Sequence, residues 1–231
     1  MQNKPAPLIA AHRGASRAER ENTVEAFARA VEMQADMVEL DVRLSADHQL
    51  VVHHDPEVHG LGPIAGLCAD ELPPYVPTLA AALDACASLQ VNVEIKSDPD
   101  EPGYDPHHRL TRLVVESLRN DRRGQRYIVS SFDRVVIDLV KELDPEMATG
   151  FLYNVSTRPG RIVEACLRDG HQAIHPSYRP LVRRTVEQAI EAGLQVNVWT
   201  VDDPGRMQLL ADWGASAIIT NVPDVAIQTL R

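Results

Sequence analysis

The sequence predicts a single parallel (β/α)8 barrel, also called a TIM barrel, and two features of the chain carry this prediction. Short runs of β-branched and other apolar residues alternate with longer amphipathic stretches, and this alternation occurs eight times with no strand left over. A length of 231 residues also suits one such domain, whereas an open doubly wound sheet usually has fewer strands. We therefore expect residues 1–231 to form one barrel domain.

The expected strands are the apolar runs that open each unit, and the expected helices follow them. Asn22 and Thr78 are residue types that suit the start of a helix. Gly170, Gly193 and Gly214 suit the end of one. The strands are expected at residues 8–11, 37–42, 91–95, 127–130, 148–152, 173–175, 195–199 and 217–220. The helices are expected at residues 22–34, 78–89, 107–120, 133–143, 160–169, 180–192, 204–213 and 223–230.

The segment after the second strand departs from this alternation. Residues 50–55, with the sequence LVVHHD, could extend the second strand or pair with it. A stretch rich in glycine and proline follows. We expect about residues 56–77 to form a short inserted loop over one end of the barrel.

Charge and composition exclude several classes of partner. The net charge of -10, without a cluster of Lys and Arg, argues against nucleic acid. No run of 18 apolar residues is present that could insert stably in a membrane, and no export signal is evident. Three widely spaced cysteines fit a reducing compartment, so we expect a cytoplasmic location. An anionic substrate would be repelled by this net charge unless a cation and nearby basic side chains set the local field.

Polar residues recur at the expected strand ends, which in a parallel barrel meet at one mouth. His12 and Arg13 follow the first strand, Glu39 and Asp41 fall late in the second, Glu94 and Lys96 end the third, and Trp199 ends the seventh. This mouth is the expected site of chemistry.

Three carboxylates in this set form a candidate metal site. Glu39 and Asp41 are two residues apart on a strand, so they share a face, while apolar neighbours occupy the other face. Glu94 comes from the next barrel strand. An oxygen-rich set of this kind suits Mg²⁺ or Ca²⁺ better than zinc.

Two structural roles without a metal are alternatives for these carboxylates. Glu39 and Asp41 could belong to an internal salt-bridge network with Arg13, Arg43 or Lys96. Glu94 and Lys96 could form a simple ion pair near the surface.

Two histidines are candidates for proton transfer. His12 precedes Arg13 and Gly14, a cation and a turn where a phosphoryl oxygen could dock, although a lone histidine there could simply bond to backbone. His54 precedes Asp55, a carboxylate that could orient its ring. The role of His175, which ends the sixth strand, stays open.

The chain resembles the bacterial glycerophosphodiester phosphodiesterases of the phospholipase-C-like barrel superfamily over nearly its whole length. No single segment is specific, but their order and their places at strand ends are specific jointly. Asn221 stands where that family usually has Asp, and Arg20 where it often has Pro; we expect neither to touch a residue of the chemistry. The matching segments are His12-Arg13-Gly14, Glu21-Asn22-Thr23, Val38-Glu39-Leu40-Asp41-Val42, residues 50–55, Asn92-Val93-Glu94-Ile95-Lys96, residues 198–201 and residues 218–224.

This resemblance implies metal-dependent cleavage of a glycerophosphodiester to glycerol 3-phosphate and an alcohol. His12 and His54 would transfer protons, Glu39, Asp41 and Glu94 would bind Mg²⁺ or Ca²⁺, and Arg13, Lys96 and Trp199 would contact the small-molecule substrate. The oligomeric state, the alcohol and the division of labour between the histidines stay open.

Two other classes of protein remain as alternatives. One is a phosphodiesterase of the same superfamily that acts on a lysophospholipid or sphingolipid, for which apolar residues of the inserted loop would dock on a membrane. The other is a barrel that binds a phosphorylated metabolite without turning it over.

Overall fold

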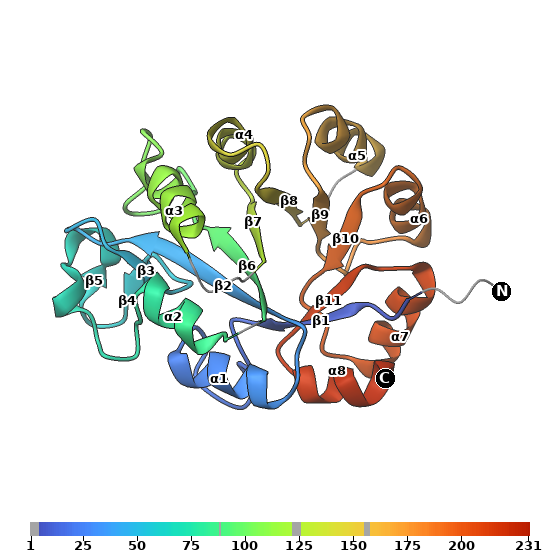
Figure 1. Cartoon of the computed structure of the whole chain (residues 1–231), viewed down its shortest axis with the longest axis horizontal. Coiled ribbons are helices and arrows are strands. Elements are labelled where there is room, and N and C mark those ends of the chain that lie inside the picture. Colours follow the sequence, from blue (N-terminus) through green and yellow to red (C-terminus); the bar gives the residue numbers. More distant parts are fainter. Residues whose placement is uncertain (1–4, 88, 122–125, 155–157) are drawn as a thin grey trace.

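The computed structural model describes residues 5–87, 89–121, 126–154 and 158–231, and these form the predicted closed parallel barrel (Figure 1). Closure is shown by β1, which pairs in parallel with β2 on one side and with β11 on the other. The eight barrel strands are β1 (Leu8–His12), β2 (Met37–Leu44), β6 (Gln90–Ile95), β7 (Tyr127–Ser131), β8 (Ala148–Tyr153), β9 (Ala173–Pro176), β10 (Gln195–Val198) and β11 (Ala217–Thr220).

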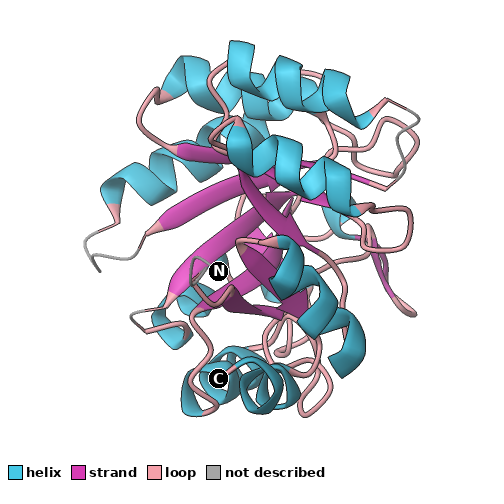
Figure 2. Ribbon diagram, turned by 90° about the vertical axis from the view of Figure 1, so that its right-hand side faces the viewer, coloured by secondary structure: helices cyan, strands magenta, loops and turns pink. Residues whose placement is uncertain are grey.

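The helices lie around the strands (Figure 2). Their buried apolar residues pack against those of the strands. Thr78 caps α2 as predicted. The N-cap of α1 is Thr23 and not Asn22, which lies one residue before the cap and has a positive φ of 57°. The predicted helix 78–89 ends earlier, and its residue 88 lies outside the described residues. The helices are α1 (Val24–Glu32), α2 (Leu79–Ala85), α3 (Arg109–Asn120), α4 (Arg134–Leu143), α5 (Pro159–Arg168), α6 (Arg183–Glu191), α7 (Pro204–Trp213) and α8 (Pro223–Leu230).

The second barrel strand is longer than predicted. β2 continues to Leu44 because β3 (Leu50–Val52) pairs antiparallel with its last residues. Glu39 and Asp41 therefore lie in the middle of β2 and not near its end. The seventh barrel strand is shorter than predicted: β10 ends at Val198, so Trp199 follows the strand and is not its last residue.

The inserted segment after β3 has a small core of its own. It contains a short hairpin, β4 (Glu57–Val58) and β5 (Gly62–Pro63), followed by 3-10 turns at Ile64–Gly66 and Ala69–Glu71. Its apolar side chains pack together and against β3; the buried ones are Val51, Val58, Ile64, Leu72 and Val76. The insertion is thus a packed cover beside the C-terminal end of β2.

The main core lies between the barrel strands and the helices. Val38, Leu40 and Val42 of β2 are fully buried in it, on the face opposite Glu39 and Asp41. Inside the barrel a small apolar group, Ala10 with Met37 and Ile219, packs together with Trp199. Polar side chains, among them Asn92 and Glu94, also line the interior cavity. Among the described residues, no helix combines the length and hydrophobicity needed to cross a bilayer.

Candidate active site

The predicted site residues meet at one cavity of about 570 Å³ at the C-terminal end of the barrel strands. Asp41 lies beside this cavity, with a carboxylate oxygen within 4.8 Å of ligand oxygens of Glu39 and Glu94. The other predicted residues line it directly: His12, Arg13, Glu39, His54, Glu94, Lys96 and Trp199. The structure therefore brings the whole predicted set together.

Strand register explains why the three carboxylates converge. Asp41 of β2 stands opposite Glu94 of β6, and Glu39 stands level with His12 of β1. Side chains at alternate positions of a strand share a face, so Glu39 and Asp41 both point into the barrel. All three carboxylates are less than a tenth exposed.

Burial and mutual repulsion oppose negative charge on two of these groups. Burial, followed by the repulsion of Asp41, raises the pKa of Glu94 to about 7. The pKa of Glu39 is raised well above its ordinary value by burial and by the charges of Asp41 and Glu94. Burial alone would also raise the pKa of Asp41, but Lys96 and Arg13 outweigh it and hold that pKa below its usual value.

Salt bridges satisfy only part of this cluster. Lys96 Nζ lies 2.8 Å from Glu94 and 3.5 Å from Asp41, and Arg13 Nε lies 3.3 Å from Asp41. Glu39 accepts one hydrogen bond, from the Arg13 backbone N–H, while its Oε1 and Asp41 Oδ1 are buried without a hydrogen-bond partner. Arg43 is not part of the network, since it binds Glu101 and the His54 carbonyl. Buried carboxylate oxygens left without a hydrogen bond in this way fit a divalent cation bound by Glu39, Asp41 and Glu94.

His12 is held in one orientation by a network that the sequence did not reveal. Its Nδ1 lies 2.7 Å from Asn221 Oδ1, which also accepts from the Ser16 hydroxyl. Asn221 Nδ2 donates to Asp202 at 2.7 Å, and a carboxylate can only accept there. The amide oxygen must therefore face His12, so Nδ1 carries the hydrogen and Nε2 is left as the proton acceptor.

The surroundings of His12 also favour the neutral imidazole. Its Nε2 points toward the carboxylates, 3.9 Å from Glu39 Oε2. Burial and the nearby Arg13 charge lower the pKa of His12, and the hydrogen bond that His12 donates to Asn221 opposes this shift. At neutral pH His12 is thus suited to accept a proton.

His54 lies across the cavity on the segment that follows β3. Its Nδ1 is 2.7 Å from Asp55 Oδ1, as the sequence suggested. Arg43 binds the His54 carbonyl through its guanidinium, which fixes the backbone of this segment. The ring is about one-third exposed, so its other nitrogen can reach a substrate in the cavity.

Trp199 and Phe132 form the apolar wall of the mouth. Their rings pack edge to face, with centroids 5.6 Å apart. Trp199 Nε1 donates to the His175 carbonyl at 2.7 Å. The His175 side chain itself is fully buried against Asn197, and burial lowers its pKa to about 3, so it is a neutral residue of the barrel interior.

Three residues of this site were missed from sequence. Asn221 was expected to contact no residue of the chemistry, which is wrong because it binds His12. Phe132 and Asn92 line the cavity, but no local pattern distinguished them. The position of Asn92, two residues before Glu94 on the same strand face, was the available signal.

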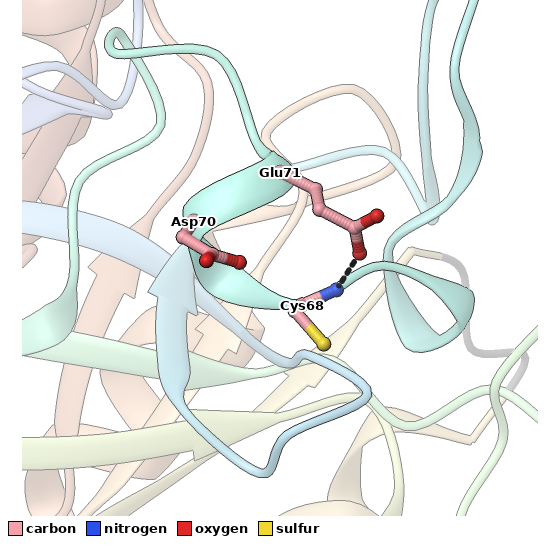
Figure 3. Close-up of side chains that lie close together, drawn as sticks. All are labelled: Cys68, Asp70 and Glu71. Carbon is pink, nitrogen blue, oxygen red and sulfur yellow. Dashed lines mark hydrogen bonds between the residues drawn. The ribbon is translucent and has the colours of Figure 1, made fainter.

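A second acidic group at Cys68, Asp70 and Glu71 has a structural explanation (Figure 3). The Glu71 carboxylate accepts from the Cys68 backbone N–H at 2.7 Å and so caps the short turn Ala69–Glu71. Asp70 and Glu71 are exposed. Among the described residues, neither Asp70 nor Glu71 has a buried carboxylate oxygen without a hydrogen bond, so this group differs from the cluster in the cavity.

Comparisons with known proteins find similar sequences and similar folds. A glycerophosphodiester phosphodiesterase of Caldanaerobacter subterraneus subsp. tengcongensis is 30% identical, over 97% of this chain and 98% of that protein. A glycerophosphodiester phosphodiesterase structure from Parabacteroides distasonis superposes with a TM-score of 0.85 at 26% identity, covering 99% of this chain and 98% of that one. An Oleispira antarctica phosphodiesterase, in complex with the product sn-glycerol-3-phosphate, gives a TM-score of 0.87 at 24% identity, with 97% and 96% coverage.

The family model agrees with these relatives. The model of the glycerophosphoryl diester phosphodiesterase family matches residues 12–225, nearly the whole barrel and every residue of the cavity described above. With the relatives and the shared fold, this match shows that the chain belongs to the glycerophosphoryl diester phosphodiesterase family.

Proposed function

We propose that the chain hydrolyses glycerophosphodiesters to glycerol 3-phosphate and an alcohol, with a divalent cation on Glu39, Asp41 and Glu94. The observation that carries this proposal is the buried carboxylate cluster, with oxygens that lack hydrogen bonds, in one cavity with two histidines. The Oleispira antarctica relative binds sn-glycerol-3-phosphate, which supports the same product for this chain. When bound, Mg²⁺ or Ca²⁺ would supply positive charge for the phosphoryl oxygens.

The two histidines take complementary roles in this proposal. His12 Nε2 accepts the proton of the attacking hydroxyl, because Asn221 holds the hydrogen on the other nitrogen. His54 then donates a proton to the departing alcohol. Quench-flow detection of a cyclic glycerophosphate would identify the glycerol hydroxyl as the attacking group, and a failure to detect it would weaken that route relative to direct attack by water.

A lipid-directed activity has less support. Docking would need apolar side chains on the insertion, but Ile64, Leu72 and Val76 are buried in its own core. Only Leu61 among the insertion's large apolar residues is about half exposed. The insertion therefore offers a small apolar surface to a membrane.

Release of glycerol 3-phosphate from glycerophosphocholine, with and without EDTA, tests the proposed function directly. We expect release that stops with EDTA and returns with Mg²⁺ or Ca²⁺. Turnover of lysophosphatidylcholine alone would favour the lipid-directed class instead. Binding of glycerol 3-phosphate without turnover of either substrate would show a non-catalytic barrel.

Lys96→Met is expected to lower kcat/KM by about 10- to 100-fold, because a charge-assisted contact to the phosphoryl group is lost. The Lys96 ammonium lies in the cavity beside Glu94 and Asp41. Steady-state kinetics with glycerophosphocholine measures this effect. Lys141→Met is the matched control, since Lys141 binds backbone carbonyls at the end of α4, and it should leave kcat/KM unchanged. Equal effects from the two variants would remove Lys96 from substrate binding.

Asn221→Leu is expected to lower kcat by about 100-fold, because His12 loses the acceptor that fixes its tautomer. ¹⁵N NMR of the imidazole should show Nδ1–H in the parent protein and a mixture of tautomers in the variant. Asn120→Leu, at an exposed position at the end of α3, is the control for an asparagine lost elsewhere. An unchanged tautomer with unchanged kcat would contradict the role of Asn221.

A further inference from the structure

Asn92 is a buried amide that the protein itself leaves unsatisfied. It points inward from β6, is 1% exposed, and lines the catalytic cavity. Among the described residues, neither its Nδ2 nor its Oδ1 has a hydrogen-bond partner. Folded proteins rarely bury both ends of an amide without partners, so a group from outside the chain is expected to satisfy it.

The position of Asn92 relates it to the deep part of the site. It stands level with Glu39 in the strand register, two residues before Glu94 on β6. The lining of the cavity also includes the apolar residues Leu152 and Ile219. Asn92 lies inside β6, whereas Lys96 follows the C-terminal end of that strand, so a ligand group that reaches Asn92 would lie deeper than a phosphoryl group held by Lys96.

The chemistry of an amide selects the kind of group it meets. Asn92 offers two donors on Nδ2 and an acceptor on Oδ1 and carries no charge. A phosphoryl group only accepts hydrogen bonds and is better matched by the cations Arg13 and Lys96. A hydroxyl both donates and accepts, so it can use both ends of the amide.

The two halves of the substrate differ in the space that they need. The alcohol varies among glycerophosphodiesters, and an adjoining cavity of about 630 Å³ opens at the mouth, sharing Glu94, Lys96 and Phe132 with the catalytic cavity. The glycerol half is small and constant, which suits the enclosed floor. We propose that Asn92 binds the terminal hydroxyl of the glycerol half and makes the enzyme selective for glycerol; this rests on the proposed function.

The test compares sn-glycerol 3-phosphate with propane-1,2-diol 1-phosphate, which keeps the hydroxyl next to the phosphate and lacks only the terminal one. Isothermal titration calorimetry of the metal-loaded protein should show that the loss of this hydroxyl weakens binding by about 10- to 100-fold. For Asn92→Leu the two ligands should bind within about threefold of each other. The kcat/KM values of the matching choline diesters should show the same loss of selectivity.

Stability gives a second readout that a structural role would not reproduce. Leucine removes an unsatisfied buried amide, so the Tm of Asn92→Leu should rise by about 2–4 °C. Asn197→Leu is the matched control, because the Asn197 amide is buried but satisfied by His175 at 2.9 Å. This control should lose stability and keep the parent selectivity.

The outcomes separate this inference from the proposed function. If the parent protein turns over glycerophosphocholine but binds both phosphates equally, the role of Asn92 is wrong and the function stands. The role is also wrong if Asn92→Leu keeps the preference for glycerol 3-phosphate over propane-1,2-diol 1-phosphate, whether or not the variant binds Mg²⁺ more weakly. If the parent protein neither binds glycerol 3-phosphate nor turns over the diester, both proposals fail.

Discussion

His12→Ala is expected to lower kcat by about 10²- to 10⁴-fold at neutral pH, and His54→Ala by a similar factor, because each removes a proton-transfer group from the cavity. Both rings line that cavity, and each has its Nδ1 bound, to Asn221 and to Asp55. Metal-loaded enzyme and glycerophosphocholine give kcat and KM. The loss should fall mainly on kcat, since Arg13 and Lys96 are the side chains proposed to hold the phosphoryl group.

Two other histidines serve as controls for these variants. His107→Ala removes an exposed imidazole and should leave kcat unchanged. His171→Ala removes a buried imidazole that binds Thr149 and Asp138, so it should lower the Tm with little change in kcat of the folded enzyme. Rates within about threefold of the parent for His12→Ala or His54→Ala would contradict the assignment of that histidine.

A double variant tests whether the two histidines act in one reaction. Groups that act as a unit in catalysis give strongly non-additive losses. The His12→Ala, His54→Ala double variant should therefore lose little more than the worse single variant. Fully additive losses would show that the two side chains serve independent steps.

Most of the carboxylate cluster could be predicted because it follows from local alternation. Glu39 and Asp41 share a strand face whatever their neighbours are, and apolar residues on the other face show which face is internal. Glu94 is preceded by apolar residues of the same kind. These patterns need only the sequence within one strand and the rule that the strands run parallel.

What could not be predicted depends on contacts between distant segments. Asn221 meets His12 across 209 positions of sequence, because barrel closure places β11 beside β1. Asn92 was not distinguished because its significance lies in the lack of partners, which depends on the registers of β2 and β7. The length of β2 likewise depended on β3, which folds back and extends its pairing to Leu44.

The charge of the carboxylate cluster has a measurable cost in the metal-free protein. Burial and Asp41 raise the pKa of Glu94 to about 7 from an ordinary 4.5, a difference that corresponds to about 3 kcal/mol. Between these pH values the folded state binds more protons than the unfolded state. The free energy of unfolding therefore falls as pH rises from 4.5 to about 7, and the cost of the charge is fully present above that range. Glu39 adds to this trend, since its pKa is raised too.

Glu94→Gln is therefore expected to make the metal-free protein more stable than its parent at pH 8, by about 1–3 kcal/mol, while abolishing stabilisation by Mg²⁺ or Ca²⁺. In the parent, metal at 100 times its Kd should raise stability by about 2.7 kcal/mol, or roughly 5–10 °C in Tm. Calorimetry in EDTA and in metal, at pH 5 and pH 8, measures both effects. The metal response should be stronger at pH 8, because binding requires ionised carboxylates. Asp70→Asn, in the exposed acidic group, should keep the parent's metal response. If neither Mg²⁺ nor Ca²⁺ changes the Tm of the parent protein at pH 8, then Lys96 and Arg13 alone neutralise the carboxylates. The cluster would then be a salt-bridge network and not a metal site.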